Sequence, residues 1–331
     1  MADPVIVSVA AAASFSIALI GTGLLSRILA RRGILDLPNQ RSSHKRATPR
    51  GGGIAVIAAI LAGFGILILA GQPLPAGFGT VIVVTVALAS VSWVDDVRGL
   101  PAAARFGLQA VCVGASLYLL PLPIPALIGG LPDWAQATIM GVAWLWFINL
   151  YNFMDGIDGI TGIETLVISL GVAVVLQAGS GGYALIAPAL IIAAAMPGFL
   201  KWNWPPAKIF MGDVGSVALG YLLGWLLLAS TSGGSTLAAV IIAGYYVADA
   251  TITLFRRAFR GERVWRAHRE HAYQKALQNG MTHGMVSMRI GILGIVLIAL
   301  ALLSFDYPLA AALTAVVIVG AVLHHFTRQR T

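Results

Sequence analysis

Charged residues are scarce in this sequence. Only 10% of its 331 residues are Asp, Glu, Lys or Arg, whereas 58% are hydrophobic and the mean hydropathy is +0.88. A water-soluble domain carries about 25% charged residues. A chain this apolar cannot bury its hydrophobic surface within a globule surrounded by water, so the sequence predicts a protein whose solvent is a lipid bilayer.

Other absences exclude several kinds of site. A single cysteine, Cys112, excludes an internal disulfide and a cysteine-rich metal site. The H-E-x-x-H zinc motif and the G-x-x-x-x-G-K-[ST] phosphate loop are also missing, which argues against a zinc enzyme and an ordinary ATP-driven motor. No internal repeat and no water-soluble domain is visible in the sequence.

Long apolar runs fill most of the chain. They are continuous rather than alternating, and a helix needs about 20 apolar residues to cross a bilayer, so the fold class is expected to be all-α and polytopic. About eleven transmembrane helices are predicted, or ten if one segment is re-entrant, within one catalytic domain over 1–331. The expected spans are 4–26, 52–71, 78–94, 105–121, 135–152, 162–178, 183–200, 214–230, 236–255, 289–304 and 308–325.

The basic residues predict the orientation of these spans. When the spans alternate in direction, all 21 Lys and Arg residues fall on one side, which the positive-inside rule makes cytoplasmic. The N-terminus is then periplasmic and the C-terminus cytoplasmic. The first span lacks a basic leader and is followed by Arg27, so we expect an anchor rather than a cleaved signal peptide. The expected cytoplasmic loops lie near 27–51, 95–104, 153–161, 201–213 and 256–288.

The net charge of +8 has two interpretations, nucleic-acid binding and membrane orientation. Orientation and contact with anionic lipid head groups explain it better in a chain of this hydropathy. We therefore expect membrane lipids, and no nucleic acid, as partners.

Polar residues gather where apolar runs meet the predicted cytoplasmic side. A carboxylate at membrane depth costs ~2.5–3.5 kcal/mol, so each of these carboxylates is a functional candidate. Three motifs carry them: Asp95 and Asp96 in "SWVDDVRGL", Asn149, Asn152, Asp155 and Asp158 in "NLYNFMDGIDGI", and Gly212 and Asp213 in "FMGDVGSVALG".

Each motif alone also has an ordinary structural explanation. Asp95 and Asp96 could start a polar loop with Arg98 as counter-ion, Asp and Gly are common in turns, and Asp213 could cap a helix. Five aspartates on one membrane face would nevertheless repel one another without a cation. Oxygen ligands beside a phosphate-bearing substrate indicate Mg²⁺, with Mn²⁺ as the alternative. Spacing alone assigns no chemistry to Asp249.

Two basic loops complete the set of candidates. "DLPNQRSSHKRATPRGGG" places His44 and Arg50 before three glycines, and "HREHAYQ" contains His268, Arg269 and His271. Positive-inside charge explains most of the arginines in these loops. The paired histidines beside Arg269 favour contacts to a phosphate or a leaving group.

In combination and order, these motifs resemble the polyprenyl-phosphate N-acetylhexosamine-1-phosphate transferases of the glycosyltransferase family 4 type. The resemblance implies a Mg²⁺-dependent phosphoglycosyl transferase of the bacterial inner membrane, with its site on the cytoplasmic face. It implies that a UDP-N-acetylamino sugar gives its sugar 1-phosphate to undecaprenyl phosphate and releases UMP, which starts a lipid-linked cell-surface glycan.

The resemblance also implies roles for individual residues. It implies catalytic and metal-binding roles for three carboxylates, Asp95, Asp96 and Asp213. Substrate-binding roles pass to His44, Arg50, Asn152, Asp155, Asp158, Gly212, His268, Arg269 and His271.

One departure from the family bears on the substrate. The muramoyl-pentapeptide branch carries three consecutive histidines where this chain reads "HREHAYQ". The sequence therefore looks more like the O-antigen or capsule-initiating branch. UDP-GlcNAc, UDP-FucNAc and UDP-QuiNAc stay open as donors, and the oligomeric state stays open, with a homodimer among the candidates.

Two other classes of function were weighed. An ion-coupled secondary transporter also has intramembrane carboxylates and broken helices, but it usually shows repeated halves and a site near the midplane. A purely structural membrane subunit would tolerate Asn at the aspartate clusters. The D-G-x₂-A-R pattern of the CDP-alcohol phosphotransferases, which share the metal chemistry, is missing here.

Overall fold

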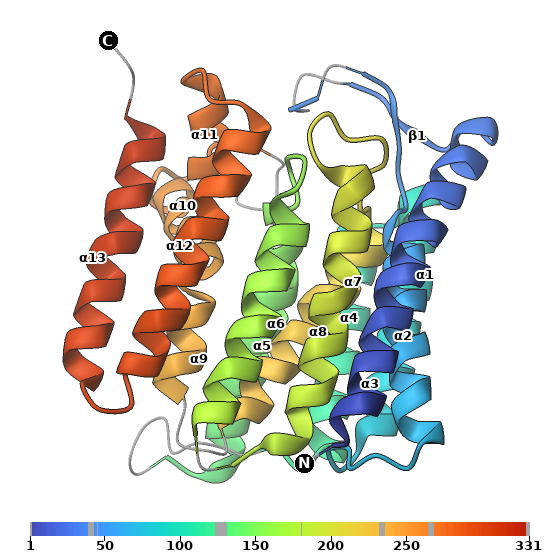
Figure 1. The fold of residues 1–331 in the computed structure, drawn as a ribbon. Helices are drawn as coiled ribbons and strands as arrows, with labels where there is room; N and C mark the ends of the chain where they lie inside the picture. The colour runs from blue at the N-terminus through green and yellow to red at the C-terminus, as the bar shows by residue number, and fades with distance from the viewer. Residues whose placement is uncertain are drawn as a thin grey trace.

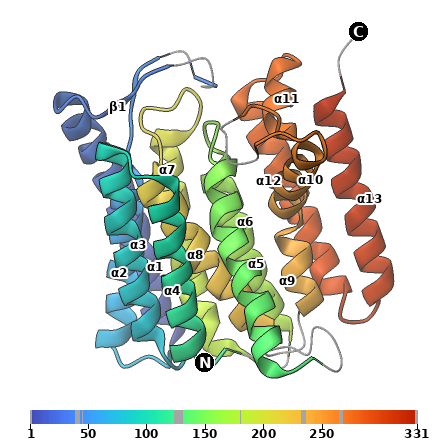
Figure 2. The same cartoon turned by 180° about the vertical axis from the view of Figure 1, so that it is seen from behind.

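Long apolar helices lie roughly side by side in one bundle (Figure 1). They are connected by short turns and a few longer loops, most of which gather at the two ends of the bundle (Figures 1 and 2). The computed structural model describes residues 2–38, 43–44, 46–122, 131–179, 181–231, 236–263 and 268–328. Residues 39–42, 45 and 264–267 of the predicted cytoplasmic loops lie outside the described residues.

The long helices follow the apolar runs of the sequence. They are α1 (Pro4–Arg31), α2 (Gly53–Leu69), α3 (Phe78–Arg98), α4 (Ala102–Leu119), α5 (Asp133–Met154), α6 (Ile160–Ala178), α7 (Ile186–Asn203), α8 (Asp213–Ser230), α10 (Gly244–Phe259), α12 (His283–Leu303) and α13 (Pro308–Thr327). The shorter elements are β1 (Leu35–Asp36), β2 (Thr48–Pro49), the 3-10 helix η1 (Tyr183–Leu185), α9 (Thr236–Ile242) and α11 (Ala272–Gln278).

The end of the bundle that carries the β1–β2 hairpin and α11 is called the polar end below. Helix α13 also ends there, whereas α1 begins at the opposite end (Figure 1). The two strands pair antiparallel, with Leu35 opposite Pro49 and Asp36 opposite Thr48. The start of α1 and the end of α13 therefore lie at opposite ends of the bundle. The cytoplasmic location of the polar end stays a prediction.

Each predicted span overlaps a helix, or two helices in the case of 236–255, but the count of eleven is not confirmed. Within the described ranges, nine helices are long and apolar enough to cross a membrane. A tenth span results if α9 and α10 are counted together. Helix α2 is apolar but has only 17 residues, which falls short of the roughly 20 needed to cross a bilayer unaided.

Two predicted boundaries were wrong. The span 236–255 is not one helix, because α9 and α10 meet at an angle of 70° beside Gly244, a residue that weakens helices. The span 78–94 ends too early, because α3 continues to Arg98. Asp95 and Asp96 therefore lie in the last turn of a helix and not in a loop.

The outer helices expose apolar side chains along their length. Exposed examples are Val5 and Ile20 of α1 and Leu309, Val316 and Val317 of α13. Apolar surface of this extent is unfavourable in water, and lipid tails would cover it. This distribution supports a multi-pass membrane protein.

Helix α8 lies inside the bundle and is buried on nearly all sides, as expected of a helix that is apolar all round. It packs mainly against α3 and α5. The indole of Trp144 on α5 stacks on the ring of Tyr221 and donates a hydrogen bond to the carbonyl of Tyr221 at 3.1 Å. Because α8 is surrounded, its first residue, Asp213, lies among the helix ends rather than at the rim of the bundle.

The segment before α2 crosses the polar end and lies against the segment before α8. The amide of Phe210 donates to the carbonyl of Pro49 at 2.8 Å. In return, the amide of Gly52 donates to the carbonyl of Phe210, and that of Gly53 donates to the carbonyl of Met211, both at 2.8 Å. These bonds fix the basic loop beside the start of α8.

Glycine at position 53 lets α2 approach α8 closely. A Cβ on Gly53 would lie 2.3 Å from backbone atoms of Gly215, which cannot move aside without separating the two helices. Overpacking of this kind costs ~1–3 kcal/mol. We therefore expect Gly53→Ala to lower the thermal unfolding midpoint of the detergent-purified protein.

The matched control is Gly65→Ala on the same helix. Nothing lies within 4 Å of a Cβ at Gly65, and Ala favours helix over Gly, so this change should leave the midpoint unchanged or raise it. Equal midpoints for Gly53→Ala and the wild type would contradict the close approach of α2 and α8.

Candidate active site

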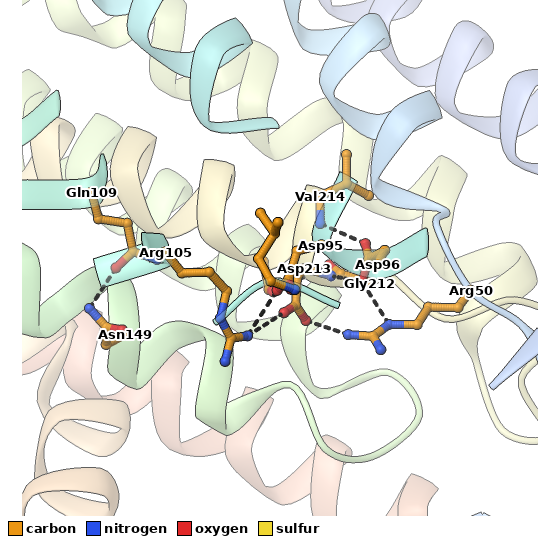
Figure 3. Close-up of polar contacts among 11 residues, drawn as sticks. Arg50, Asp95, Asp96, Arg105, Gln109, Asn149, Gly212, Asp213 and Val214 are labelled. Carbon is orange, nitrogen blue, oxygen red and sulfur yellow. Dashed lines mark hydrogen bonds and ion pairs between the residues drawn. The ribbon is translucent and has the colours of Figure 1, made fainter. Parts of the chain in front are cut away.

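Three helix ends and one loop bring charged residues together at the polar end (Figure 3). Asp95 and Asp96 lie in the last turn of α3, and Asp213 begins α8. Arg50 precedes α2, and Arg105 lies near the start of α4. The structure thus brings the three predicted catalytic carboxylates together from distant parts of the chain.

The carboxylate of Asp96 caps helix α8 from a neighbouring helix. Its two oxygens accept hydrogen bonds from the amides of Asp213 at 3.0 Å and Val214 at 2.9 Å. A helix N-terminus carries unpaired amides and partial positive charge, and both favour an anion there. Gly212 permits the approach, because its φ is 75° and a Cβ on it would lie 2.7 Å from Asp96 Oδ2.

Two arginines hold the carboxylates in place (Figure 3). Arg50 Nε donates to Asp96 Oδ1 at 2.8 Å, and a terminal nitrogen of Arg50 donates to Asp213 Oδ1 at 2.5 Å. Arg105 donates to Asp95 Oδ2 at 2.8 Å and lies 3.4 Å from Asp213 Oδ2. Burial lowers the pKa of Arg50, but the charges of Asp213 and Asp96 raise it by more, so its pKa stays above the ordinary value.

Sequence reasoning missed the role of Arg105, which was used only as a marker of orientation. Arg98 was considered as the counter-ion of the aspartate pair, but it is exposed, and Arg105 is the partner of Asp95. The chain turns back after α3, and the amide of Leu100 donates to Asp95 Oδ1 at 2.6 Å. The signal in the sequence that could have indicated this role is an arginine that follows the Asp–Asp pair by a few residues.

The turn after α5 brings Asp155 and Asp158 to the same end. Asp155 Oδ1 accepts a hydrogen bond from Thr161 Oγ1 at 2.5 Å, and Asp158 Oδ2 accepts one from the amide of Ala207 at 3.0 Å. Gly159 ends the turn with a φ of 82°, which glycine adopts without strain. Burial raises the pKa of Asp155 to about 7, while the hydrogen bond from Thr161 acts in the opposite direction.

His283, at the start of α12, is a site residue that the sequence did not indicate. Its Nδ1 lies 3.2 Å from Asp158 Oδ1, and its Nε2 lies 3.2 Å from the carbonyl oxygen of Ser43. The ring therefore connects α12 with the turn after α5 and with the basic loop. No local pattern marks it, because a histidine at a helix start is ordinary and only the fold brings it to Asp158.

Two cavities open at these residues. The polar cavity, of about 350 Å³, is lined by His283 and by most of the predicted substrate-binding residues, namely His44, Arg50, Asn152, Asp155, Asp158 and Gly212. The apolar cavity, of about 840 Å³, lies mainly between α3, α4 and α5 and includes Asp95, Arg105, Phe106, Gln109, Val142, Asn149 and Phe153 in its lining. Asn152 and Asp213 line both cavities, so the two meet there.

Asn149 and Asn152 lie on the same face of α5, and both line the apolar cavity. The side chain of Asn149 donates to Gln109 Oε1 and to the carbonyl of Leu145, both at 2.8 Å (Figure 3). Asn149 therefore sits in an amide pair with α4, whereas Asn152 lies where the cavities meet.

The residues of the "HREH" motif lie beside the polar cavity rather than in its lining. The rings of His268 and His271 are 4.8 Å apart, and His271 is buried with its Nδ1 3.6 Å from Asp249 Oδ1. Gln274, three residues later, does line the polar cavity. The structure does not place His268, Arg269 and His271 at the cavity wall, and contact of these residues with a substrate stays a prediction.

The carboxylates suit a divalent cation in chemistry and charge. Four carboxylates face two arginines, which leaves two formal negative charges on Asp95, Asp96, Asp155 and Asp213. In the part of the chain that the structure describes, no group of three or more His, Cys, Asp or Glu side chains is arranged to hold a metal ion. Arg50 and Arg105 already contact the carboxylates, so a bound cation would replace one arginine contact of Asp213.

A polar, charged cavity thus meets an apolar one at this end of the bundle. Comparison with known proteins identifies the family. The family model described as glycosyl transferase family 4 matches residues 78–231, which contain all three aspartate motifs.

Relatives of known name agree with this match. A phospho-N-acetylmuramoyl-pentapeptide-transferase of Pseudarthrobacter chlorophenolicus is 32% identical over 314 residues, covering 73% of this chain and 85% of the relative. A probable undecaprenyl-phosphate N-acetylglucosaminyl 1-phosphate transferase of Bacillus subtilis is 28% identical over 288 residues, covering 84% and 79%. A decaprenyl-phosphate N-acetylglucosaminephosphotransferase of Mycobacterium tuberculosis is 28% identical over 344 residues, covering 91% and 83%.

The chain belongs to glycosyl transferase family 4 and, within it, to the polyprenyl-phosphate hexosamine-1-phosphate transferases. The resemblance drawn from the motifs is thereby confirmed.

The partly buried His268, beside the buried His271, makes the stability of the protein depend on pH. Burial, followed by the charges of His271 and Arg257, lowers the pKa of His268 from 6.5 to about 4. Between these values the unfolded chain binds a proton that the folded chain does not, so stability falls as the pH falls. When the pH is lowered from about 7.5 to about 5, the thermal unfolding midpoint should therefore fall less in His268→Gln than in the wild type.

The control is His324→Gln, which changes an exposed histidine on α13. It should show the same loss of midpoint as the wild type over this pH range. A His268→Gln variant with the wild-type pH dependence would refute the contribution of His268.

Proposed function

We propose that this protein transfers an N-acetylamino-sugar 1-phosphate from a UDP-sugar to undecaprenyl phosphate and releases UMP. The observation that carries the proposal is the meeting of the polar and apolar cavities at Asn152 and Asp213. A water-soluble, anionic donor and a lipid acceptor need two such compartments with one shared point. Two relatives are named for undecaprenyl phosphate or decaprenyl phosphate and for the transfer of an N-acetylglucosamine phosphate group, which supports the proposal.

The polar cavity suits the donor. Its lining combines the guanidinium of Arg50 with backbone and side-chain groups at the start of α8. Arginine and a helix N-terminus both favour phosphate oxygens, so a diphosphate would find donors there. The carboxylates of Asp155 and Asp158 can accept hydrogen bonds from the hydroxyl or amide groups of a nucleoside sugar.

The apolar cavity suits a polyprenyl phosphate. Phe106, Val142 and Phe153 line it and are also exposed on the outside of the bundle, so the cavity opens towards the lipid. Arg105 and Asp95 lie at its polar limit, beside Asp213. A prenyl chain could therefore enter from the bilayer while its phosphate reaches Arg105.

The proposed chemistry is direct phosphoryl transfer. An oxygen of the acceptor phosphate attacks the sugar-linked phosphorus, a new P–O bond forms, and the bond to UMP breaks with its electron pair leaving on UMP. Positioning and charge neutralisation dominate such a reaction. Arg105 would orient the acceptor, Arg50 would stabilise the departing phosphate, and Asp95, which faces the apolar cavity, would take any proton from the acceptor phosphate.

Asp96 has a different part in this scheme. Its oxygens are engaged by the amides of Asp213 and Val214 and by Arg50, so it would fix the start of α8 rather than touch a substrate. Mg²⁺, with Mn²⁺ as the alternative, would be held by Asp213 with Asp95 or Asp96, and would supply positive charge beside the diphosphate.

The sugar and the pathway are proposed from the sequence of one loop. "HREHAYQ" lacks the three histidines of the muramoyl-pentapeptide branch, which favours an O-antigen or capsule pathway over the peptidoglycan precursor. Relatives are named for N-acetylglucosamine transfer, so UDP-GlcNAc belongs among the candidate donors with UDP-FucNAc and UDP-QuiNAc. We place the protein in the bacterial inner membrane, with the polar end in the cytoplasm.

UMP release tests the function directly. Purified protein is incubated with undecaprenyl phosphate, Mg²⁺ and each of the three UDP-sugars in turn. We expect UMP from one sugar, only when the lipid is present, and none from Asp213→Asn or after chelation with EDTA.

The controls separate the alternatives. UMP formation that survives EDTA would remove the metal from the proposal without removing the reaction. Well-folded protein that releases no UMP with any donor, but moves ions across proteoliposomes, would replace the proposal with an ion-coupled transporter.

Arg105 provides a residue-level test of the acceptor site. Removing a charged donor to a phosphate costs ~1.5–3 kcal/mol, so Arg105→Gln should raise KM for undecaprenyl phosphate about tenfold or more. The matched control is Arg98→Gln, which changes an exposed arginine at the end of α3 and should leave both KM values unchanged. An unchanged acceptor KM in Arg105→Gln would remove this residue from the acceptor site.

A further inference from the structure

Asp249 is a buried carboxylate that the proposed reaction does not use. It lies on α10, its side chain is 1% exposed, and it lines neither cavity. Desolvating a carboxylate is unfavourable unless its oxygens are hydrogen-bonded. The partners of Asp249 therefore indicate why the residue is there.

The oxygens of Asp249 accept hydrogen bonds from two places. Two donors lie on α10 itself. Thr253, one turn after Asp249, donates from Oγ1 to Oδ1 at 3.3 Å, and Tyr245, one turn before it, donates from Oη to Oδ2 at 3.2 Å. The amides of Ala272 and Tyr273 donate to Oδ1 and Oδ2 at 2.8 Å and 3.2 Å. One carboxylate thus joins the transmembrane bundle to the start of α11.

Helix α11 has little to hold it in place by itself. It has only seven residues, and a helix this short is not stable in isolation. Its first amides have no partner within the helix, and Asp249 supplies one. Loss of this anchor would release α11 from α10.

Helix α11 in turn forms part of the donor side of the site. Tyr273 is fully buried, and its hydroxyl donates to the carbonyl of Phe153 at 3.1 Å, at the end of α5. The same hydroxyl lies so close to Gly156 that a Cβ there would overlap it. Gln274 lines the polar cavity, and no residue of α11 lines the apolar one.

We propose that Asp249 is a positioning residue for the nucleotide-sugar side of the site. It holds α11 so that Tyr273 supports the turn bearing Asp155 and Gln274 completes the wall of the polar cavity. The inference rests on the proposed function for its kinetic consequence, but the anchoring of α11 is independent of it. Asp249 contacts no substrate and takes no part in proton transfer.

The test is Asp249→Asn, analysed with both substrates. Asn keeps the shape but presents an NH₂ group to one of the two amides, so the anchor is weakened. We expect KM for the UDP-sugar to rise at least about fivefold, while KM for undecaprenyl phosphate stays within about twofold. A general loss of folded protein would instead lower the apparent kcat and leave both KM values unchanged.

A second variant covers the case in which Asp249→Asn does not fold. Tyr273→Phe removes only the hydroxyl that donates to Phe153, and it should raise KM for the UDP-sugar in the same direction. The matched control is Tyr307→Phe, an exposed tyrosine directly before α13, which should behave as wild type.

Hydrogen exchange separates this proposal from the proposed function. The amides of residues 272–278 should exchange faster in Asp249→Asn than in the wild type, whatever reaction the protein catalyses. Unchanged exchange, or KM values that both stay at wild-type level in folded Asp249→Asn, would overturn the inference. If the amides exchange faster in Asp249→Asn but the wild-type protein releases no UMP, only the proposed function is overturned.

Discussion

The contact between Asp96 and the first turn of α8 underlies the whole site. It binds the end of α3 to the start of α8, and Arg50 extends it to the loop before α2. Because α8 is enclosed by other helices, it cannot shift without disturbing the core. Carboxylates and arginines that would be mobile on a surface are thereby fixed relative to two cavities.

The position of this contact explains how one site can serve water and lipid. Helices supply the only backbone structure that is stable in lipid here, so polar groups must come from helix ends. Four helix ends supply Asp95, Arg105, Asp155 and Asp213 at the polar end of the bundle. Each carboxylate is compensated by an arginine, an amide or a hydroxyl, which lowers the free-energy cost of burying charge.

The sequence predicted the helices and much of the site, because both depend on local pattern. Continuous apolar runs located every long helix, and the aspartate motifs indicated that Asp95, Asp96 and Asp213 belong to one site. Arg105, His283 and the 70° bend at Gly244 were missed. The role of each depends on which segments meet in space. The partner of Asp95 lies across the turn after α3, and the partner of His283, Asp158, lies in the turn after α5, far away in the chain.

The sharing of Asn152 and Asp213 by both cavities has a consequence for ligand design. Under the proposed function, a molecule that joins a nucleotide-like group to an apolar tail through this point would occupy both compartments at once. Once its first half is bound, the second half is held at a high effective concentration, and the two affinities reinforce each other if the linker fits. The passage between the cavities, rather than either cavity alone, therefore sets the length and charge of such a linker.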